Sequence, residues 1–292
     1  MSQTRSWLVK VVLALAVLAF VGISMVPLFA AFNQQNDKQT PAQNNASAGN
    51  NVASTDQKSK LQDEVRGYQL VLQREPENQT ALKGLLQARL QLLTLKEGDI
   101  QGVIEPLEKL AKLNPEQTEY AVLLAQAKQQ IGDKEGAAQA YRSVLSTKPG
   151  DLKALQGMVS LLLSQQRPEA AIGLLQDTLS AAPQANKIQP GSVDTVAVQV
   201  LLGTVHASQK RYPQAISAYD QAIQKDTKDF RPVLAKAMLL KQQGKVAEAK
   251  PLFNTASALA PAQYKDEINK AAEVAPVPAP TASSTASPAS KP

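Results

Sequence analysis

The side chains that could do acid–base, nucleophilic or metal chemistry are few in this chain of 292 residues. Histidine occurs once, at His206, and cysteine does not occur, which excludes a Cys–His pair, cysteine-based metal sites and disulfides. His206 falls in an apolar stretch with helical character, where packing explains an imidazole better than acid–base catalysis does. The sequence therefore predicts no catalytic residue and no metal ligand.

Neighbouring carboxylates and glycines also form no recognisable site. Asp63 and Glu64, like Asp266 and Glu267, are adjacent along the chain, so on a helix their side chains point in different directions. Glycines such as Gly157 lie inside helical stretches and match no phosphate-binding loop. We therefore expect no enzyme activity and no cofactor.

The net charge of +6 does not indicate a nucleic-acid partner. No run of five Lys or Arg occurs, and the aromatic residues, 4% of the chain, are not interleaved with basic ones. A nucleic-acid surface needs such a concentrated basic patch, so nucleic acid is not an expected partner.

A regular spacing organises the chain. A small residue recurs at Val103, Ala137 and Ala171 and, after an insertion, at Ala215 and Ala249. A bulky residue follows each after four positions, and a helix terminator stands eight positions further on. The bulky residues are Leu107, Tyr141, Leu175, Tyr219 and Phe253, and the terminators are Pro115, Pro149, Pro183, Thr227 and Pro261. Small residues let two helices cross closely, bulky ones fill the adjoining gap and proline ends a helix, so five helix pairs are predicted.

The turn inside each pair needs a residue that tolerates an unusual backbone. Five positions before the small residue stand Gly98, Gly132 and Gly244, with Gln166 and Lys210 in the other two pairs. We expect these five residues to close the turns, less favourably where glycine is missing.

This frame resembles the tetratricopeptide repeat (TPR) family, whose period is about 34 residues, over roughly positions 61 to 272. The stretch from Leu202 to His206 is similar to the family's L-G-x2-Y, with His206 in place of tyrosine and Gln199 where tryptophan is frequent. The resemblance implies an all-α fold, a TPR α-solenoid of antiparallel helix pairs whose partners are proteins or peptides.

The repeat frame also sets the predicted boundaries. The units are a partial one at 61–78, full ones at about 79–117, 118–151, 152–185, 196–229 and 230–263, and a cap helix at 264–272. The ten-residue insertion falls in 184–194, where Pro190-Gly191 predicts a loop that could carry recognition. Residues 273–292 are rich in Ala, Pro, Ser and Thr, which predicts a disordered tail.

The amino-terminal region predicts a membrane anchor that precedes the solenoid. The stretch from Val11 to Phe32 (11–32) carries no charge, and it exceeds the length of about 20 residues that one transmembrane helix needs. A cleaved signal peptide is the alternative, although its apolar core is usually only about 7 to 15 residues long. Arg5 and Lys10, in the basic segment 1–10, favour a cytoplasmic amino terminus with the repeats in the periplasm or a lumen. The polar stretch 33–60 is predicted to be a flexible tether.

A narrower resemblance concerns three stretches of the repeat region. Residues 72–90, 112–128 and 228–245, together with the anchor and the Gln/Asn-rich tether, resemble membrane-anchored TPR proteins of cyanobacteria and plastids. That resemblance implies a plasma or thylakoid membrane and a link to the biogenesis of photosynthetic membranes.

The first helix of each pair should line a groove. On the helical face that we expect to point inward lie Lys83, Gln87, Gln126, Gln130, Gln156, Ser160, Thr204, Ser208, Arg231 and Met238. These residues form either an ordinary solvated surface or a groove for an extended or helical peptide. The leading hypothesis is a membrane-tethered scaffold or assembly factor. The alternatives are a structural subunit of a stable envelope or secretion complex and an accessory that localises an enzyme.

Overall fold

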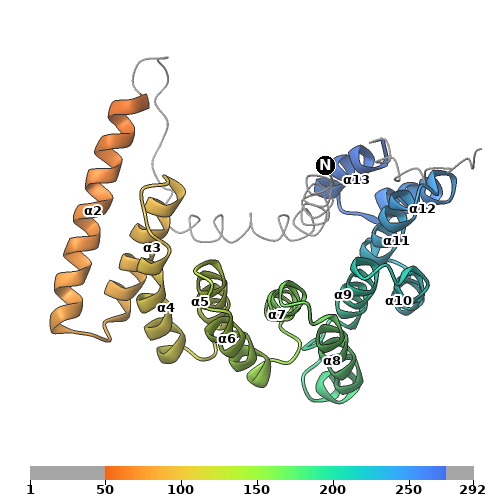
Figure 1. Cartoon of the computed structure of the whole chain (residues 1–292), viewed down its shortest axis with the longest axis horizontal. Coiled ribbons are helices and arrows are strands. Elements are labelled where there is room, and N and C mark those ends of the chain that lie inside the picture. Colours follow the sequence, from red (N-terminus) through yellow and green to blue (C-terminus); the bar gives the residue numbers. More distant parts are fainter. Residues whose placement is uncertain (1–49, 274–292) are drawn as a thin grey trace, which may run out of the picture. The chain divides into compact units, whose positions relative to one another are not determined.

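The computed structural model describes residues 50–273, and this part of the chain consists of twelve helices without any strand (Figure 1). The helices are α2 Asn50–Arg74, α3 Gln79–Thr94, α4 Gln101–Leu113, α5 Thr118–Gln130, α6 Lys134–Thr147, α7 Leu152–Ser164, α8 Pro168–Ile188, α9 Thr195–Ser208, α10 Tyr212–Lys225, α11 Phe230–Gln242, α12 Val246–Leu259 and α13 Ala262–Glu273. The predicted all-α class is confirmed.

The chain divides into two compact units, residues 1–56 and 57–292, and the repeats belong to the second. The predicted basic segment 1–10, the transmembrane helix at 11–32, most of the tether and the tail after Glu273 lie outside the described residues. None of the helices between Asn50 and Glu273 is long and apolar enough to cross a membrane.

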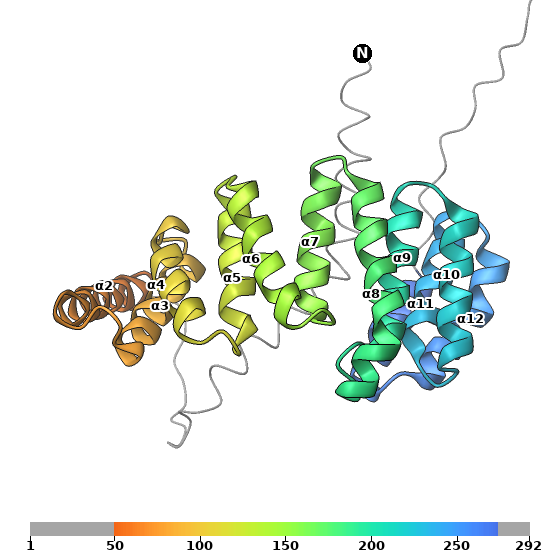
Figure 2. The same ribbon diagram turned by 90° about the horizontal axis from the view of Figure 1, so that it is seen from below.

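The helices of the second unit pair in chain order, as the spacing predicts. α3 packs on α4, α5 on α6, α7 on α8, α9 on α10 and α11 on α12, and each pair also contacts the next (Figures 1 and 2). The five small residues at the crossings, from Val103 to Ala249, are at most 1% exposed. Their small side chains allow the two helices of a pair to approach closely, and this close approach buries them.

Three tyrosines need a glycine on the helix opposite, the first of them Tyr68 on α2, whose ring lies against Gly84 on α3. The ring of Tyr141 on α6 lies against Gly157 on α7, and the ring of Tyr219 on α10 lies against Gly203 on α9, so closely that a Cβ at either glycine would overlap the ring. Burial also raises the pKa of Tyr141 to about 12. Gly157 and Gly203 are therefore packing positions, and their lack of a side chain makes room for an aromatic one.

One left-handed residue closes each of the five turns. φ is +84° at Gly132 and +79° at Gly244, and +59° at Lys96, Gln166 and Lys210. In each turn the following N–H donates to the carbonyl five residues back, as Arg167 does to Leu162 at 2.9 Å. The prediction for Gly98 was wrong. The link between α3 and α4 is longer than the link in the next pair, so counting back from Val103 misses Lys96, which takes the left-handed place.

Two predicted boundaries also need correction. α2 begins at Asn50, so residues 50–60 are helical and do not belong to a flexible tether; no Gly or Pro interrupts the stretch, and Leu61 is buried. Pro183 does not end its helix, because α8 continues to Ile188. Part of the ten-residue insertion therefore lengthens α8, whose Ala182 is fully buried, and only residues 189–194 remain as a loop.

The loop after α8 is held in a fixed conformation by Asn186. Its side-chain amide donates to the Val193 carbonyl at 2.9 Å, and its oxygen accepts from the Val193 N–H at 2.8 Å and from the Ser192 hydroxyl at 3.1 Å. Val193 is 3% exposed, and the backbone of Ser192 and Val193 lies where a Cβ on Gly150 would be. We call Asn186, Ser192, Val193 and Gly150 the insertion clasp.

The last helix covers the end of the array. On α13, Ile268 is 2% exposed and Tyr264 stacks on Phe230 of α11 with ring centroids 5.4 Å apart. The Lys241 amine donates to the carbonyls of Ala271 and Ala272, at the carboxyl end of α13. A cation at this end of a helix is stabilising, so α13 is a firmly attached cap.

Candidate protein-binding site

The first helices of successive pairs form one continuous surface. α5 contacts α7, α7 contacts α9 and α9 contacts α11, whereas α3 packs mainly on α4. Figure 1 shows these helices on one side of the array, with α6, α8 and α10 on the other. We call the surface made by α5, α7, α9 and α11 the first-helix face.

All ten residues predicted for the groove are accessible to solvent, at least in part. Lys83 and Gln87 lie on α3, outside the continuous series of contacts. The other eight lie in pairs on the first-helix face: Gln126 and Gln130 on α5, Gln156 and Ser160 on α7, Thr204 and Ser208 on α9, and Arg231 and Met238 on α11. The structure thus brings together eight of the ten.

Three of the eight are already engaged in internal bonds. The Thr204 hydroxyl donates to the Val200 carbonyl at 2.9 Å, and the Ser208 hydroxyl donates to the Val205 carbonyl at 2.7 Å. Arg231 bridges two helix caps, with Nη2 2.8 Å from Asp194 and 2.6 Å from Asp229. The paired carboxylates raise the pKa of Arg231, so this side chain offers little free charge to a ligand.

The four residues on α5 and α7 remain available. Gln126, Gln130, Gln156 and Ser160 make no side-chain hydrogen bond to any other described residue. Their amides and hydroxyl can both donate and accept, which suits the backbone of a bound peptide. The polar part of the candidate site is therefore centred on α5 and α7.

Four leucines on the same face were missed by the sequence reasoning. Leu123, Leu163, Leu201 and Leu234 are partly buried and partly exposed on α5, α7, α9 and α11. Each stands three residues from a predicted groove residue, a spacing that puts the two side chains next to each other on a helix. That spacing was the available signal. The first-helix face combines hydrogen-bonding and apolar groups, which suits an amphipathic segment.

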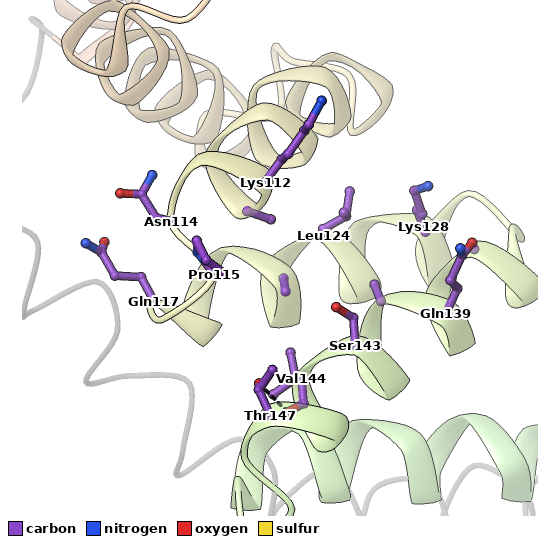
Figure 3. A pocket seen from close by; sticks show the side chains of 14 residues that line it. Lys112, Asn114, Pro115, Gln117, Leu124, Lys128, Gln139, Ser143, Val144 and Thr147 are labelled. Carbon is purple, nitrogen blue, oxygen red and sulfur yellow. Dashed lines mark hydrogen bonds between the residues drawn. The ribbon is translucent and has the colours of Figure 1, made fainter.

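A separate hollow opens where α4, α5 and α6 meet, with a volume of about 230 Å³ (Figure 3). Its apolar residues include Ala111, Ala121, Leu124, Ala140 and Val144. The polar and charged residues around them are Lys112, Asn114, Gln117, Lys128, Gln139, Ser143 and Thr147. We call this hollow the α5 notch. Nothing in the sequence reasoning predicted it.

His206, the one histidine of the sequence, lies near the carboxyl end of α9. Its imidazole is partly buried in α9, and Nδ1 has no hydrogen-bond partner among the described residues. Burial is the main cause that lowers the pKa of His206; Arg211 lowers it further, and Glu169 opposes both. Arg211 and Glu169 form an ion pair with each other. Both the partial burial and the neighbouring Arg211 thus favour the neutral form of the imidazole over the charged one.

Known proteins are similar to parts of this chain. One curated relative is protein SLOW GREEN 1, chloroplastic, from Arabidopsis thaliana, which is 28% identical over 204 residues, 70% of this chain and 62% of that protein. Another is Cellulose synthase operon protein C from Pseudomonas fluorescens (strain SBW25), 29% identical over 49% of this chain and 11% of that protein. The chain thus spans less than two thirds of either relative.

Among solved structures, a crystal structure of MamA protein is 22% identical, with a TM-score of 0.40 over 70% of this chain and 100% of that one. A family model described as tetratricopeptide repeat matches two stretches, which hold the capping turns at Gly132, Gln166, Lys210 and Gly244. Residues 132–189 and 206–266 of this chain are therefore tetratricopeptide repeats.

Proposed function

We propose that the chain is a membrane-tethered scaffold that binds protein segments on its first-helix face and takes part in assembling membrane-associated proteins. The observation that carries the proposal is the unbroken series of contacts from α5 to α11, which places accessible amides beside partly exposed leucines. An amphipathic segment finds both hydrogen-bond partners and apolar contacts on such a surface. The proposal assigns no reaction to the chain itself.

The proposed location is a plasma or thylakoid membrane, with the repeats on the periplasmic or lumenal side. The uncharged stretch from Val11 to Phe32, with Arg5 and Lys10 before it, supports this orientation. The similarity to a protein named as chloroplastic supports a photosynthetic compartment. Tethering would raise the effective concentration of the first-helix face for membrane-associated clients without adding a contact.

A second candidate function is a structural subunit of an envelope or secretion complex. One observation favours it, namely the similarity of 143 residues to a protein named for a cellulose synthase operon. In such a subunit the side formed by α6, α8 and α10 would be permanently covered. The two candidates therefore differ in which side of the repeats meets the partner.

Site-specific photo-crosslinking in native membranes separates these candidates. A photoreactive amino acid replaces Gln126 on the first-helix face or, as the matched control, the exposed Gln176 on α8. The scaffold predicts crosslinked products mainly from position 126, with the yield reduced at least about fivefold by Ser160→Arg, which blocks the adjoining helix. Products mainly from position 176 would overturn the scaffold in favour of the structural subunit.

The tether is tested separately by fractionation. The full chain should remain in the membrane pellet after an alkaline carbonate wash, whereas a variant with residues 11–32 replaced by a polar linker should not. A full chain that washes off would rule out a transmembrane anchor and leave the binding surface to be judged by the crosslinks.

A further inference from the structure

The α5 notch exists because three side chains are short. Ala111, Ala121 and Ala140 line it, and one repeat further along the chain the same positions are Leu145, Leu155 and Leu174. Leu155 is fully buried, and Leu145 and Leu174 pack against the same core cluster. We use the word junction for the place where the second helix of one pair packs against both helices of the next pair. The junction around α7 has room for three leucines and is filled by them, whereas the junction around α5 holds three alanines at the same positions.

The preceding junction is filled as well. One repeat earlier, the positions that correspond to Ala111, Ala121 and Ala140 are Leu72, Leu82 and Pro106. For the first two, the count uses the longer spacing of the first unit. Leu82 is 1% exposed, Pro106 is buried and Leu72 packs against the core. The notch is thus an unfilled junction between two filled ones. The surfaces that form its walls correspond to surfaces that leucine side chains contact in the junctions before and after it.

Size and shape limit what the notch can hold. Sites for small molecules usually enclose about 300 to 1,000 Å³, and the notch offers about 230 Å³ that are open to solvent on one side. Such a hollow cannot surround a free small molecule, but it can take one branched apolar side chain carried by a larger partner. The chain itself shows the fit, because leucines occupy the corresponding places in the neighbouring junctions, except where Pro106 takes one of them.

The charge around the notch selects among apolar segments. Lys112 and Lys128 are the charged residues among the fourteen that line it, and no carboxylate is among them. Lys128 is paired with Glu108 at 2.7 Å, whereas Lys112 is exposed and forms no ion pair among the described residues. The flexible Lys112 side chain can reach a carboxylate held close to the notch. The acids next to the notch, Glu108 and Asp133, both face Lys128, so Lys112 is the charge left to attract an acidic partner.

We propose that the α5 notch is a second protein-binding site, which takes a leucine or isoleucine side chain of a partner segment that carries a carboxylate within one helical turn. The site lies across α4, α5 and α6 and does not use the first-helix face. It is therefore independent of the proposed function and can fail or hold separately.

The test uses the full chain in detergent micelles with one fluorine label at a time. Because the chain has no cysteine, Gln139→Cys gives a unique label at the rim of the notch, and Ser160→Cys gives one on the first-helix face. The probe is an amidated twelve-residue peptide of Ala, Gln and Ser with one Leu and, four residues before it, one Glu. Control peptides carry Ala for Leu or Gln for Glu.

The expected result is a saturable fluorine shift at position 139. The peptide without leucine should bind at least about tenfold more weakly, because the buried apolar contact is lost. The peptide without glutamate should bind only about threefold more weakly, because the ion pair with Lys112 is exposed. Lys112→Gln should remove that threefold difference and leave the leucine preference intact.

A filled notch provides the decisive variant. Ala121→Leu combined with Ala140→Leu copies two of the three leucines of the next junction, so the protein should stay folded while the response at position 139 weakens at least about tenfold. Binding retained within twofold in this variant, equal binding of the leucine and alanine peptides, or no binding at all would each overturn the proposal. A shift at position 160 alone would likewise reject the notch and assign the peptide to the first-helix face.

Discussion

The junctions around α5 and around α7 share one backbone plan and differ mainly in how completely they are filled. Around α7, Leu155 is fully buried between α6 and α8; around α5, Ala121 takes the same repeat position and the α5 notch remains open. The turns show the opposite order, because the pair with the open notch has the more favourable turn residue. The α5/α6 pair has Gly132 at its left-handed turn position, whereas the α7/α8 pair uses Gln166.

The difference teaches that the repeat frame tolerates a vacancy. The crossing residues Ala137 and Ala171 are fully buried in both pairs, so the helix pairs form whether or not the outer leucine positions are filled. The junction around α7 can therefore stabilise the fold through packing, while the junction around α5 leaves an apolar surface open to a partner. In a solenoid this separation is possible because each unit depends mainly on its nearest neighbours.

The largest effect on this comparison is expected when the leucine that fills the α7 junction is removed. Leu155→Ala should lower the free energy of unfolding by about 2 to 5 kcal/mol, because it leaves a cavity at a fully buried position. Urea denaturation of the full chain, followed by circular dichroism, measures the change. A loss below about 1 kcal/mol would mean that the surroundings of α7 collapse into the space and that the two junctions are equivalent.

The two helical glycines of the α7/α8 pair respond differently to a methyl group. Gly157→Ala should destabilise by about 1 to 3 kcal/mol, because the new Cβ overlaps the Tyr141 ring. Gly173→Ala meets no atom within 4 Å and should instead stabilise the helix by about 0.5 to 1 kcal/mol. Thermal melts of both variants test the pair, and melting points that shift in the same direction would contradict the tyrosine contact.

Filling the open junction should have a smaller effect of the opposite sign. Ala121→Leu with Ala140→Leu is expected to stabilise by about 1 kcal/mol, because apolar surface now exposed in the notch becomes covered. The same urea series measures it, with the exposed substitution Gln176→Leu as a control for added leucine alone. Destabilisation would show that the notch walls cannot accept the side chains found in the next junction.

Exchanging the turn residues sharpens the contrast between the pairs. Gln166→Gly should stabilise by about 0.5 to 1 kcal/mol, and Gly132→Ala should destabilise by about 1 kcal/mol, because a left-handed backbone strains any residue with a Cβ. Chemical denaturation with native-state amide exchange near each turn reports both changes. If neither variant shifts stability, the hydrogen bonds of the turns outweigh the strain.

The smallest effect concerns acidity at His206, in the following pair. Because burial lowers its pKa, the unfolded chain binds a proton more readily, and stability should fall as the pH drops through the ordinary histidine value of about 6.5. His206→Gln should flatten this part of the profile between about pH 7.5 and 5.5, a window above the ordinary carboxylate range. Melting temperatures across the window measure it, and identical profiles would show that the imidazole stays hydrated.

Most of the fold could be predicted because spacing carries it. The recurrence from Val103 to Ala249 marks five crossings, and all five are buried. Helix boundaries were harder to predict, because a proline can either end a helix or lie within one. Pro183 is exposed on α8 and does not end this helix, which continues to Ile188. Lys96 takes the left-handed position because the link that follows α3 is longer than the frame assumes.

The candidate site was only partly predictable. Solvent access of Gln126 and Gln156 follows from helical periodicity, whereas the ion pairs of Arg231 with two helix caps depend on where Asp194 comes to lie after the insertion. The notch left no signal in any single residue, because alanine is common in this chain. Comparison of Ala121 with Leu155 at the same repeat position would have revealed it.

The insertion clasp has a consequence for how such a chain can be recombined. Gly150 precedes α7, whereas Ser192 and Val193 follow α8, yet the loop backbone occupies the space that a side chain at position 150 would need. A graft that moved the inserted segment behind another helix pair would meet a side chain at the corresponding entrance unless that residue were also changed to glycine. The inserted loop and Gly150, which an entire repeat separates along the chain, are therefore expected to evolve together. A family alignment should show that they are gained and lost together.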